Sequence, residues 1–266
     1  MNSFLASWGG LRDKLENARI FLFLDFDGTI SPIAPTPREA RLPADIKTLL
    51  RKLSRCKDCK IAIISGRPLK DIKKKVGLKK IIYAGNHGFE INGAGLEYKV
   101  PISRIYRKTL LEIRKVVTRK ISAIKGALIE DKGYSLAIHY RCVKKCDLRI
   151  FRAMMRRILK PYLAKKTLCV KDGKMVFELT APKRWDKGRA VKWLLNKSEH
   201  SVRKRSIVPV YIGDDLTDED AFRALKNNGI TVVVKKPGHS CAKYYVTGIS
   251  GVASLLKKVA RLKGIL

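Results

Sequence analysis

Two carboxylates that could act on a phosphate group follow an apolar run near the N-terminus. Residues 20–24 are all apolar, which favours a buried parallel strand, and Asp25 and Asp27 come directly after them. Ligands of open α/β sheets bind at the carboxyl ends of the strands. A carboxylate at that edge can serve as a nucleophile, and a second one two residues later can serve as acid and base.

Three later segments could complete such a site. Ser65 and Thr29 offer hydroxyl groups to a phosphate, and Lys187 opens a predicted helix, where its charge and the helix dipole both favour an anion. Asp214 and Asp215 follow another apolar run, and Mg²⁺ is usually held by one or two carboxylates, waters and phosphate. Together these parts fit phosphoryl transfer, which needs a nucleophile in line, a cation and fixed donors.

Each part has a simpler explanation when taken alone. Asp25 to Thr29 could be a strand-to-turn junction, residues 65–67 a turn before a helix, and Asp214 with Asp215 a helix N-cap. Lys187 is one of many lysines. Acidic residues are scarce in this chain, however, and two predicted strand ends each carry a pair of them, so we favour the functional interpretation.

The elements that must hold these residues alternate between strand and helix at crossover spacing, which predicts a doubly wound parallel sheet. Strands are expected at residues 20–24, 60–65, 80–84, 208–212 and 230–234, and helices at residues 3–17 (interrupted by Gly9 and Gly10), 43–53, 69–76, 187–195, 218–225 and 251–262.

The pattern changes in the middle of the chain. A helix and two strands are expected there twice, at residues 106–125, 127–130 and 135–140, and again at 147–163, 168–171 and 175–179. We therefore predict an α/β core formed by residues 1–103 and 184–266, and an inserted α+β cap formed by residues 104–183.

The composition is that of a globular protein, apart from its charge. The chain has 266 residues, 45% of them hydrophobic, and 58 Lys and Arg against 23 Asp and Glu, a formal charge of +35. No apolar run is long enough for a membrane span and no signal peptide is evident, so a soluble, cytoplasmic monomer is expected. The basic residues are dispersed, which favours a solvated surface with weak polyanion binding over a specific nucleic-acid site.

The segments that carry the candidate chemistry resemble a known family. Asp25 to Thr29, Ser65, Lys187 and residues 213–215 resemble the four signatures of haloacid dehalogenase superfamily phosphatases. More narrowly, the chain is similar to trehalose-6-phosphate phosphatases at DFDGTISPI (25–33), ISGR (64–67), AGNHGFEI (84–91), WDKGRAV (185–191) and YIGDDLTDEDAF (211–222).

This resemblance implies a role for each core residue. Asp25 would be the nucleophile and a Mg²⁺ ligand, Asp27 the acid/base and a ligand through its backbone carbonyl, and Asp214 the third ligand. Lys187 would be catalytic, and Asp215 and Asp218 would hold waters or Lys187. The expected phosphate contacts are Gly28, Thr29, Ser65, Gly66 and Lys187.

The resemblance also implies that the cap selects the sugar. The expected substrate contacts are Arg67, Glu130, Lys132, Arg141 and Glu178. Glu130 and Lys132 could instead form an exposed turn pair. The segment 179–182 after Glu178 reads LTAP, where family members often have an arginine, and this departure concerns the sugar rather than the phosphate chemistry.

The resemblance predicts Mg²⁺-dependent hydrolysis of trehalose 6-phosphate through an aspartyl-phosphate. Two alternatives stay open. One is another sugar phosphate, such as sucrose phosphate or mannosylglycerate phosphate. The other is a catalytically idle, basic nucleic-acid-binding module on the same fold, which would have no need of Asp25, Asp27, Lys187 and Asp214 together.

Overall fold

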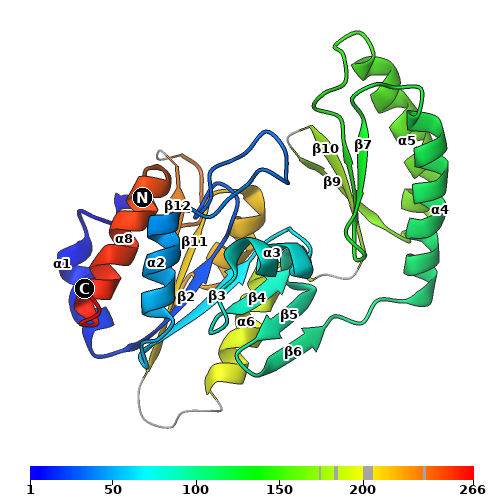
Figure 1. Cartoon of the computed structure of the whole chain (residues 1–266). Coiled ribbons are helices and arrows are strands. Elements are labelled where there is room, and N and C mark those ends of the chain that lie inside the picture. The colour runs from blue at the N-terminus through cyan, green and yellow to red at the C-terminus, as the bar shows by residue number, and fades with distance from the viewer. Residues whose placement is uncertain (174, 183–184, 200–205, 236–237) are drawn as a thin grey trace. The chain divides into compact units, whose positions relative to one another are not determined.

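The computed structural model describes residues 1–173, 175–182, 185–199, 206–235 and 238–266, and the chain forms two compact units (Figure 1). The larger unit combines Met1–Lys99 with Trp185–Leu266, and the smaller unit, called the cap below, is Val100–Arg184. The expected boundaries were 103/104 and 183/184, and the second of these lies outside the described residues.

The larger unit is built on a sheet that, in the described part of the chain, has nine strands in the order β1-β13-β12-β11-β2-β3-β4-β5-β6. The neighbours from β1 to β4 are parallel, and β5 and β6 add an antiparallel hairpin. The strands are β1 (Asn2–Ser3), β2 (Arg19–Leu24), β3 (Cys59–Ile64), β4 (Ile82–Gly85), β5 (Glu90–Gly93), β6 (Leu96–Lys99), β11 (Ile207–Gly213), β12 (Ile230–Val234) and β13 (Tyr244–Val246).

Helices cover both faces of this sheet. Alternate residues of β2 point to opposite faces, so Leu22 and Leu24 join one apolar cluster while Phe21 and Phe23 join the other. The first cluster is closed by α1 (Trp8–Glu16), α2 (Ala44–Leu53), α3 (Leu69–Val76) and α8 (Gly248–Leu262), and the second by α6 (Lys187–Glu199) and α7 (Glu219–Ala224). The predicted doubly wound α/β core is confirmed.

The cap is a separate α+β layer pair. Its antiparallel sheet has the order β7-β8-β10-β9, with β7 (Leu128–Asp131), β8 (Leu136–His139), β9 (Cys169–Gly173) and β10 (Val176–Thr180). Helices α4 (Arg104–Ile121) and α5 (Leu148–Ala164) pack side by side and bury apolar residues such as Ile113 and Phe151. Phe151 meets Phe177 of β10 at 6.3 Å between ring centroids, so one face of the sheet is covered by these helices.

Two expectations about the edges of the core were wrong or incomplete. The N-terminal helix does not begin at residue 3, because Asn2 and Ser3 pair with Tyr244 and Tyr245 as a strand, and α1 runs through Gly9 and Gly10 without interruption. The hairpin β5–β6 and the strand β13 had no prediction. Strands of three or four residues give too little alternating pattern for a sequence to distinguish them from loops.

Candidate active site

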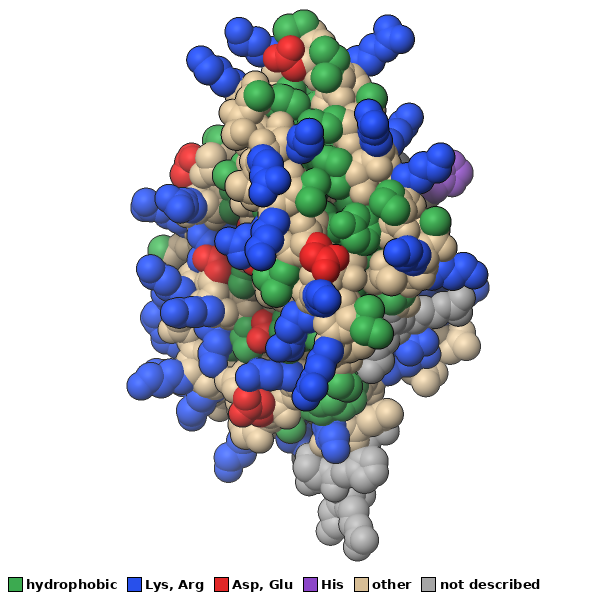
Figure 2. Space-filling model, turned by 90° about the vertical axis from the view of Figure 1, so that its right-hand side faces the viewer, with side chains coloured by type: hydrophobic (Ala, Val, Ile, Leu, Met, Phe, Trp, Pro, Cys, Tyr) green, Lys and Arg blue, Asp and Glu red, His purple; other side chains and the backbone are tan. Residues whose placement is uncertain are grey.

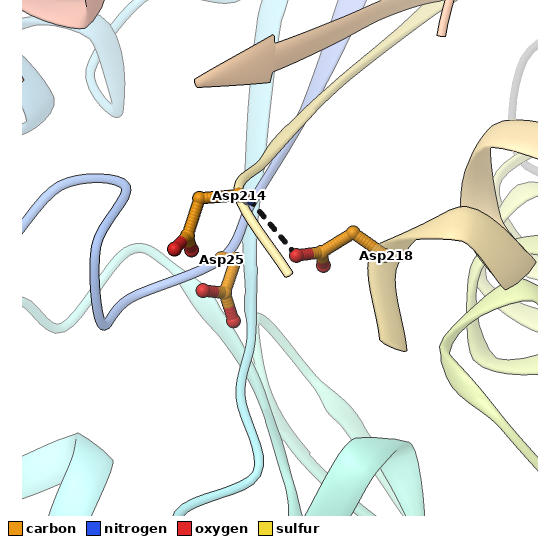
Figure 3. Close-up of side chains that lie close together, drawn as sticks. All are labelled: Asp25, Asp214 and Asp218. Carbon is orange, nitrogen blue, oxygen red and sulfur yellow. Dashed lines mark hydrogen bonds between the residues drawn. The ribbon is translucent and has the colours of Figure 1, made fainter. Parts of the chain in front are cut away.

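Three carboxylates from the ends of neighbouring elements meet at the carboxyl edge of the sheet. Asp25 follows β2 and Asp214 follows β11, and these strands pair over six residues, so their ends are adjacent. Asp218, at the end of the 3₁₀ turn η2 (Leu216–Asp218), completes the group (Figure 3). One oxygen from each carboxylate lies within 4.8 Å of the others.

Lys187 is placed between two of these carboxylates. Its Nζ donates to Asp25 Oδ1 at 2.7 Å and to Asp218 Oδ1 at 2.8 Å, and all three side chains are buried. Burial alone would lower the pKa of Lys187, but the charges of Asp218 and Asp25 outweigh it and raise the pKa. The ammonium group therefore stays charged beside Asp25.

Asp218 organises the site rather than facing outwards. Besides Lys187, its Oδ1 accepts a 2.7 Å hydrogen bond from the Tyr211 hydroxyl, and its Oδ2 accepts from the backbone amides of Asp214 (3.1 Å) and Asp215 (3.0 Å). The Asp214 bond is dashed in Figure 3. Four donors thus fix one fully buried carboxylate, and through it the turn that carries Asp214. Asp215 itself is exposed at the start of η2, where its side chain caps the turn.

Tyr211 is a site residue that the sequence analysis missed. It is fully buried on β11, and burial together with Asp218 raises the pKa of its hydroxyl, which therefore remains a donor. The available signal was its spacing: a tyrosine two residues before Gly213 points to the same face of the strand as Gly213, the face toward η2 and Asp218.

Two glycines allow the carboxylates to approach the backbone. Gly28 has φ +80°, and a Cβ there would coincide with the Asp214 carboxylate. A Cβ on Gly213 would likewise collide with the Asp218 carboxyl group. Gly28, which was expected to contact phosphate, is therefore also required by the fold, because a residue with a Cβ would leave no room for the Asp214 carboxylate.

Burial and like charges shape the titration of the cluster. Burial raises the pKa of Asp25 well above its usual value, although Lys187 opposes this effect. Burial and the neighbouring Asp218 raise the pKa of Asp214 to about 6. Crowded carboxylates of this kind are what a hard divalent cation neutralises, because such cations take oxygen ligands. The donor set and its spacing therefore fit a metal ion.

The hydroxyl groups expected at the phosphate lie close to this cluster. Thr29 is buried and its Oγ1 donates to Asp214 Oδ1 at 3.2 Å, so in this structure it supports a carboxylate. Ser65 is buried at the end of β3, and its Oγ accepts from the backbone amide of Arg67 at 3.2 Å. Gly66 packs against the ring of His87, where a Cβ would lie 2.7 Å from the ring.

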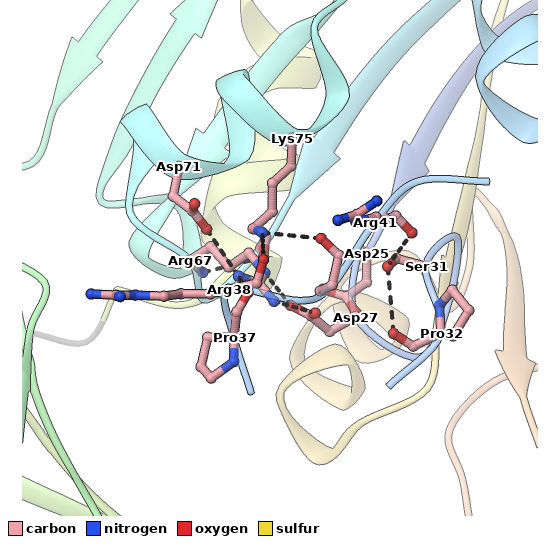
Figure 4. Close-up of polar contacts among 12 residues, drawn as sticks. Asp25, Asp27, Ser31, Pro32, Pro37, Arg38, Arg41, Arg67, Asp71 and Lys75 are labelled. Atoms are coloured by element: carbon pink, nitrogen blue, oxygen red, sulfur yellow. Dashed lines mark hydrogen bonds and ion pairs between the residues drawn. The ribbon is translucent and has the colours of Figure 1, made fainter. Parts of the chain in front are cut away.

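Asp27 turns away from the carboxylate cluster toward Arg67. Arg67 Nε donates to Asp27 Oδ2 at 2.6 Å and Nη2 donates to Asp27 Oδ1 at 2.7 Å (Figure 4). Burial alone would lower the pKa of Arg67, but its bonds to Asp27 and Asp71 raise it, so the guanidinium stays charged. The structure thus places Arg67, expected at the sugar, on the expected acid/base.

Within the cap, two of the predicted substrate residues, Glu130 and Glu178, share the sheet face that α4 and α5 leave open. Glu130 and Glu178 both pair with Ala137 of β8, one from each side, so their side chains point the same way. Glu178 Oε1 is 3.1 Å from Lys132 Nζ, and Glu130 Oε2 is 2.9 Å from His139 Nε2. Arg141 follows β8 and is exposed.

His139 adds a member that the sequence-based site did not include. Its alternation with Ala137 along β8 places it on the open face. Its contact with Glu130 depends on how β7 and β8 pair, and the amino-acid pattern of β8 alone does not reveal that register.

Comparison with known proteins identifies the family. Residues 23–250 match the model of the Trehalose-phosphatase family. The chain is 32% identical over 280 residues to trehalose 6-phosphate phosphatase RA3 of Zea mays, covering 98% of this chain and 75% of the relative. It is 34% identical over 227 residues to a trehalose-phosphate phosphatase of Mycobacterium bovis, covering 85% of this chain and 56% of the relative.

A solved structure agrees with these relatives. The C-terminal domain of C. albicans trehalose-6-phosphate phosphatase superposes with a TM-score of 0.76 and 25% identity, over 97% of both chains. None of the helices in the described part of the chain has the length and apolarity that a membrane span requires. The family match includes the Asp25, Lys187 and Asp214 segments, and the chain belongs to the trehalose-phosphatase family of phosphatases.

Proposed function

We propose that this phosphatase hydrolyses trehalose 6-phosphate to trehalose and inorganic phosphate through an aspartyl-phosphate on Asp25. The observation that carries the proposal is the group of Asp25, Lys187 and Asp214 at the carboxyl edge of the sheet, in which Asp25 and Lys187 are buried and Lys187 Nζ lies 2.7 Å from Asp25 Oδ1. The relatives named above supply the substrate, since each is named for trehalose phosphate.

The reaction has two steps with one covalent intermediate. An Asp25 oxygen attacks phosphorus, and the bond from phosphorus to the sugar oxygen breaks while Asp27 gives that oxygen a proton. Asp27 then takes a proton from water, the water oxygen attacks phosphorus, and the bond to Asp25 breaks. Lys187 orients Asp25 throughout, and the hydroxyls of Thr29 and Ser65, with the backbone at Gly28 and Gly66, hold the phosphate oxygens.

We propose Mg²⁺ as the cation, held by Asp25, Asp214 and the backbone carbonyl of Asp27, with Asp215 and Asp218 supporting waters and Lys187. When bound, the ion neutralises negative charge on the phosphate oxygens. Because the carboxylates crowd one another without a cation, we expect Mg²⁺ to raise the melting temperature of the protein, and EDTA to abolish phosphate release until Mg²⁺ is restored. Full activity in metal-free buffer would contradict this assignment.

The decisive experiment measures phosphate release from a panel of sugar phosphates. Trehalose 6-phosphate should have the highest kcat/KM, with sucrose phosphate and mannosylglycerate phosphate as the competing candidates. A preference for either of these would keep the phosphatase chemistry and change the substrate. Hydrolysis of none of them in Mg²⁺ would favour the idle binding-module alternative.

We propose that the open face of the cap sheet recognises the sugar through Glu130, Lys132, Arg141 and Glu178. We expect Glu130→Ala or Glu178→Ala to lower kcat/KM for trehalose 6-phosphate at least about tenfold, or roughly 1.4 kcal/mol. The reason is that sugar hydroxyl groups which donate to these carboxylates would be left without an acceptor. Such binding energy also aligns the phosphate, so kcat can fall together with affinity.

The control for the cap separates recognition from folding. Activity on p-nitrophenyl phosphate, which has no sugar, should change far less in both variants. Asp131→Ala is the matched substitution, since Asp131 is the next residue of β7, points to the other face and pairs with Arg114. Equal losses on both substrates would indicate a structural role for the two glutamates.

The basic surface predicts weak, salt-sensitive polyanion binding. Figure 2 shows Lys and Arg side chains spread over one whole face of the molecule, and residues 100–184 alone contain 23 Lys and Arg against 6 Asp and Glu. We expect the protein to bind DNA or heparin at about 50 mM salt and to lose most of that affinity by about 200 mM, as counterion release requires. Sequence-selective binding that persists at the higher salt concentration would argue for a true nucleic-acid site.

A further inference from the structure

The guanidinium of Arg67 is almost fully committed to other protein groups. Two of its N–H groups bind both oxygens of Asp27, and Nη1 donates to Asp71 Oδ2 at 2.9 Å and to the carbonyl of Pro37 at 2.8 Å. Four of the five N–H groups of a guanidinium are then in use. The residue is 9% exposed, so little of it is available to a substrate.

The backbone and side chain of Arg67 are fixed from further directions. Its amide donates to Ser65 Oγ at 3.2 Å, and its carbonyl accepts from the amide of Asn86 at 2.8 Å. Its guanidinium lies 5.4 Å from the centre of the Phe26 ring, the residue between the two catalytic aspartates. A planar fork that is held in this way can orient a carboxylate in both distance and angle.

Asp27, in contrast, has few constraints of its own. Its side chain is 40% exposed, and Arg67 provides the hydrogen bonds to both of its oxygens. The loop beside it is tied to α3 as well, since Lys75 Nζ donates to the carbonyls of Arg38 and Ala40 (Figure 4). Arg67 thus connects Asp27 to this loop through Pro37 and to α3 through Asp71.

We infer that Arg67 is a positioning residue that sets the orientation of Asp27 for proton transfer, and that it does not contact the sugar. The inference rests on the proposed function, in which Asp27 gives a proton to the leaving sugar oxygen. Such a transfer requires the two heavy atoms to lie about 2.6–3.2 Å apart. The Asp27 side chain is 40% exposed, so without its two hydrogen bonds from Arg67 it would spend most of its time in other rotamers.

The test uses leaving groups that differ in their need for a proton. A sugar alkoxide needs one, whereas p-nitrophenolate leaves without it. We expect Arg67→Met to lower kcat for trehalose 6-phosphate at least about tenfold with KM changed less than about threefold. The first-turnover release of nitrophenolate from p-nitrophenyl phosphate should stay within about threefold of wild type, because it requires no acid.

A double-mutant cycle then identifies the group through which Arg67 acts. In an Asp27→Asn background, Arg67→Met should cause no further loss, because its effect depends on Asp27. Arg67→Lys keeps the positive charge but cannot donate to both oxygens of Asp27 in the same plane, so it should lose activity as well. This variant tests the role of Arg67 if Arg67→Met does not fold. Arg38→Met, in the same loop and exposed, is the matched control and should behave as wild type.

Three outcomes would overturn the inference. A rise in KM with kcat unchanged would make Arg67 a substrate contact, additive losses in the cycle would remove Asp27 from the explanation, and a gain in kcat would mean that the fork restrains Asp27. Failure of the proposed function is a separate result, in which the wild-type protein itself releases no phosphate from any sugar phosphate.

Discussion

Asp25→Asn should reduce phosphate release to below about 1% of wild type while leaving the fold intact. The amide cannot attack phosphorus to form the acyl phosphate, and it withdraws one negative charge from the expected metal site. Asn has nearly the shape of Asp, its amide oxygen can still accept the hydrogen bond from Lys187, and Lys187 keeps its ion pair with Asp218, so the fold should be retained. Activity on trehalose 6-phosphate and the melting temperature are the two measurements.

The intermediate can be detected directly in the wild-type protein. Borohydride reduces an aspartyl-phosphate to homoserine, so acid-quenched enzyme treated in this way should carry homoserine at position 25 by mass spectrometry. Asp13→Asn, on the exposed side of α1, is the matched control and should keep full activity. A variant at position 25 with more than a few per cent of wild-type turnover would show that another group is the nucleophile.

Lys187→Met should be both inactive and less stable. Its ammonium is the partner of Asp25 and Asp218 in a buried cluster, and removing one member of a buried ion pair costs roughly 3–5 kcal/mol of unfolding free energy. Loss of the positive charge beside the nucleophile should lower kcat by at least about a hundredfold. Denaturant titration in EDTA measures the first effect, and phosphate release in Mg²⁺ measures the second.

The stability difference should persist across neutral pH. The pKa of Lys187 is raised in the folded protein, so its stabilising contribution is complete below the unfolded value of about 10.4 and is lost only as the pH rises through the higher folded value. Lys192→Met, an exposed position on the same helix, is the control. If both variants unfold at the same denaturant concentration, the buried ion pairs contribute no net stability.

The sequence indicated the core of the site because its residues follow long, buried strands. Asp25 and Asp214 could be placed together from the amino-acid pattern alone, since apolar runs predict central parallel strands and the ends of such strands meet at one edge. The same reasoning located Ser65, whereas Lys187 was proposed because it opens a predicted helix. The cap residues Glu130 and Glu178 were proposed from resemblance alone, and the strand register that aligns them on either side of Ala137 was not readable in the sequence.

Two side-chain contacts around the site escaped prediction. Tyr211 looks like an ordinary core aromatic until its hydroxyl is seen on Asp218, and nothing in the sequence shows that the guanidinium of Arg67 binds both oxygens of Asp27. The strand alternation of Tyr211 indicates only which face it lies on, and the contact between Arg67 and Asp27 joins segments 40 residues apart, which periodicity does not encode. The β5–β6 hairpin was missed for a different reason, since its strands are short and only partly buried.

The pairing of β2 with β11 has a consequence for folding. Phe21 pairs with Pro209, so the two central strands of the sheet come from opposite ends of the chain, with the whole cap between them. Closing such a long loop carries an entropic cost, which a cap that has already folded would reduce by shortening the disordered connection. Asp25 and Asp214 cannot meet until that closure is complete. Recovery of phosphatase activity during refolding should therefore report the last long-range step, after the cap has regained its own secondary structure.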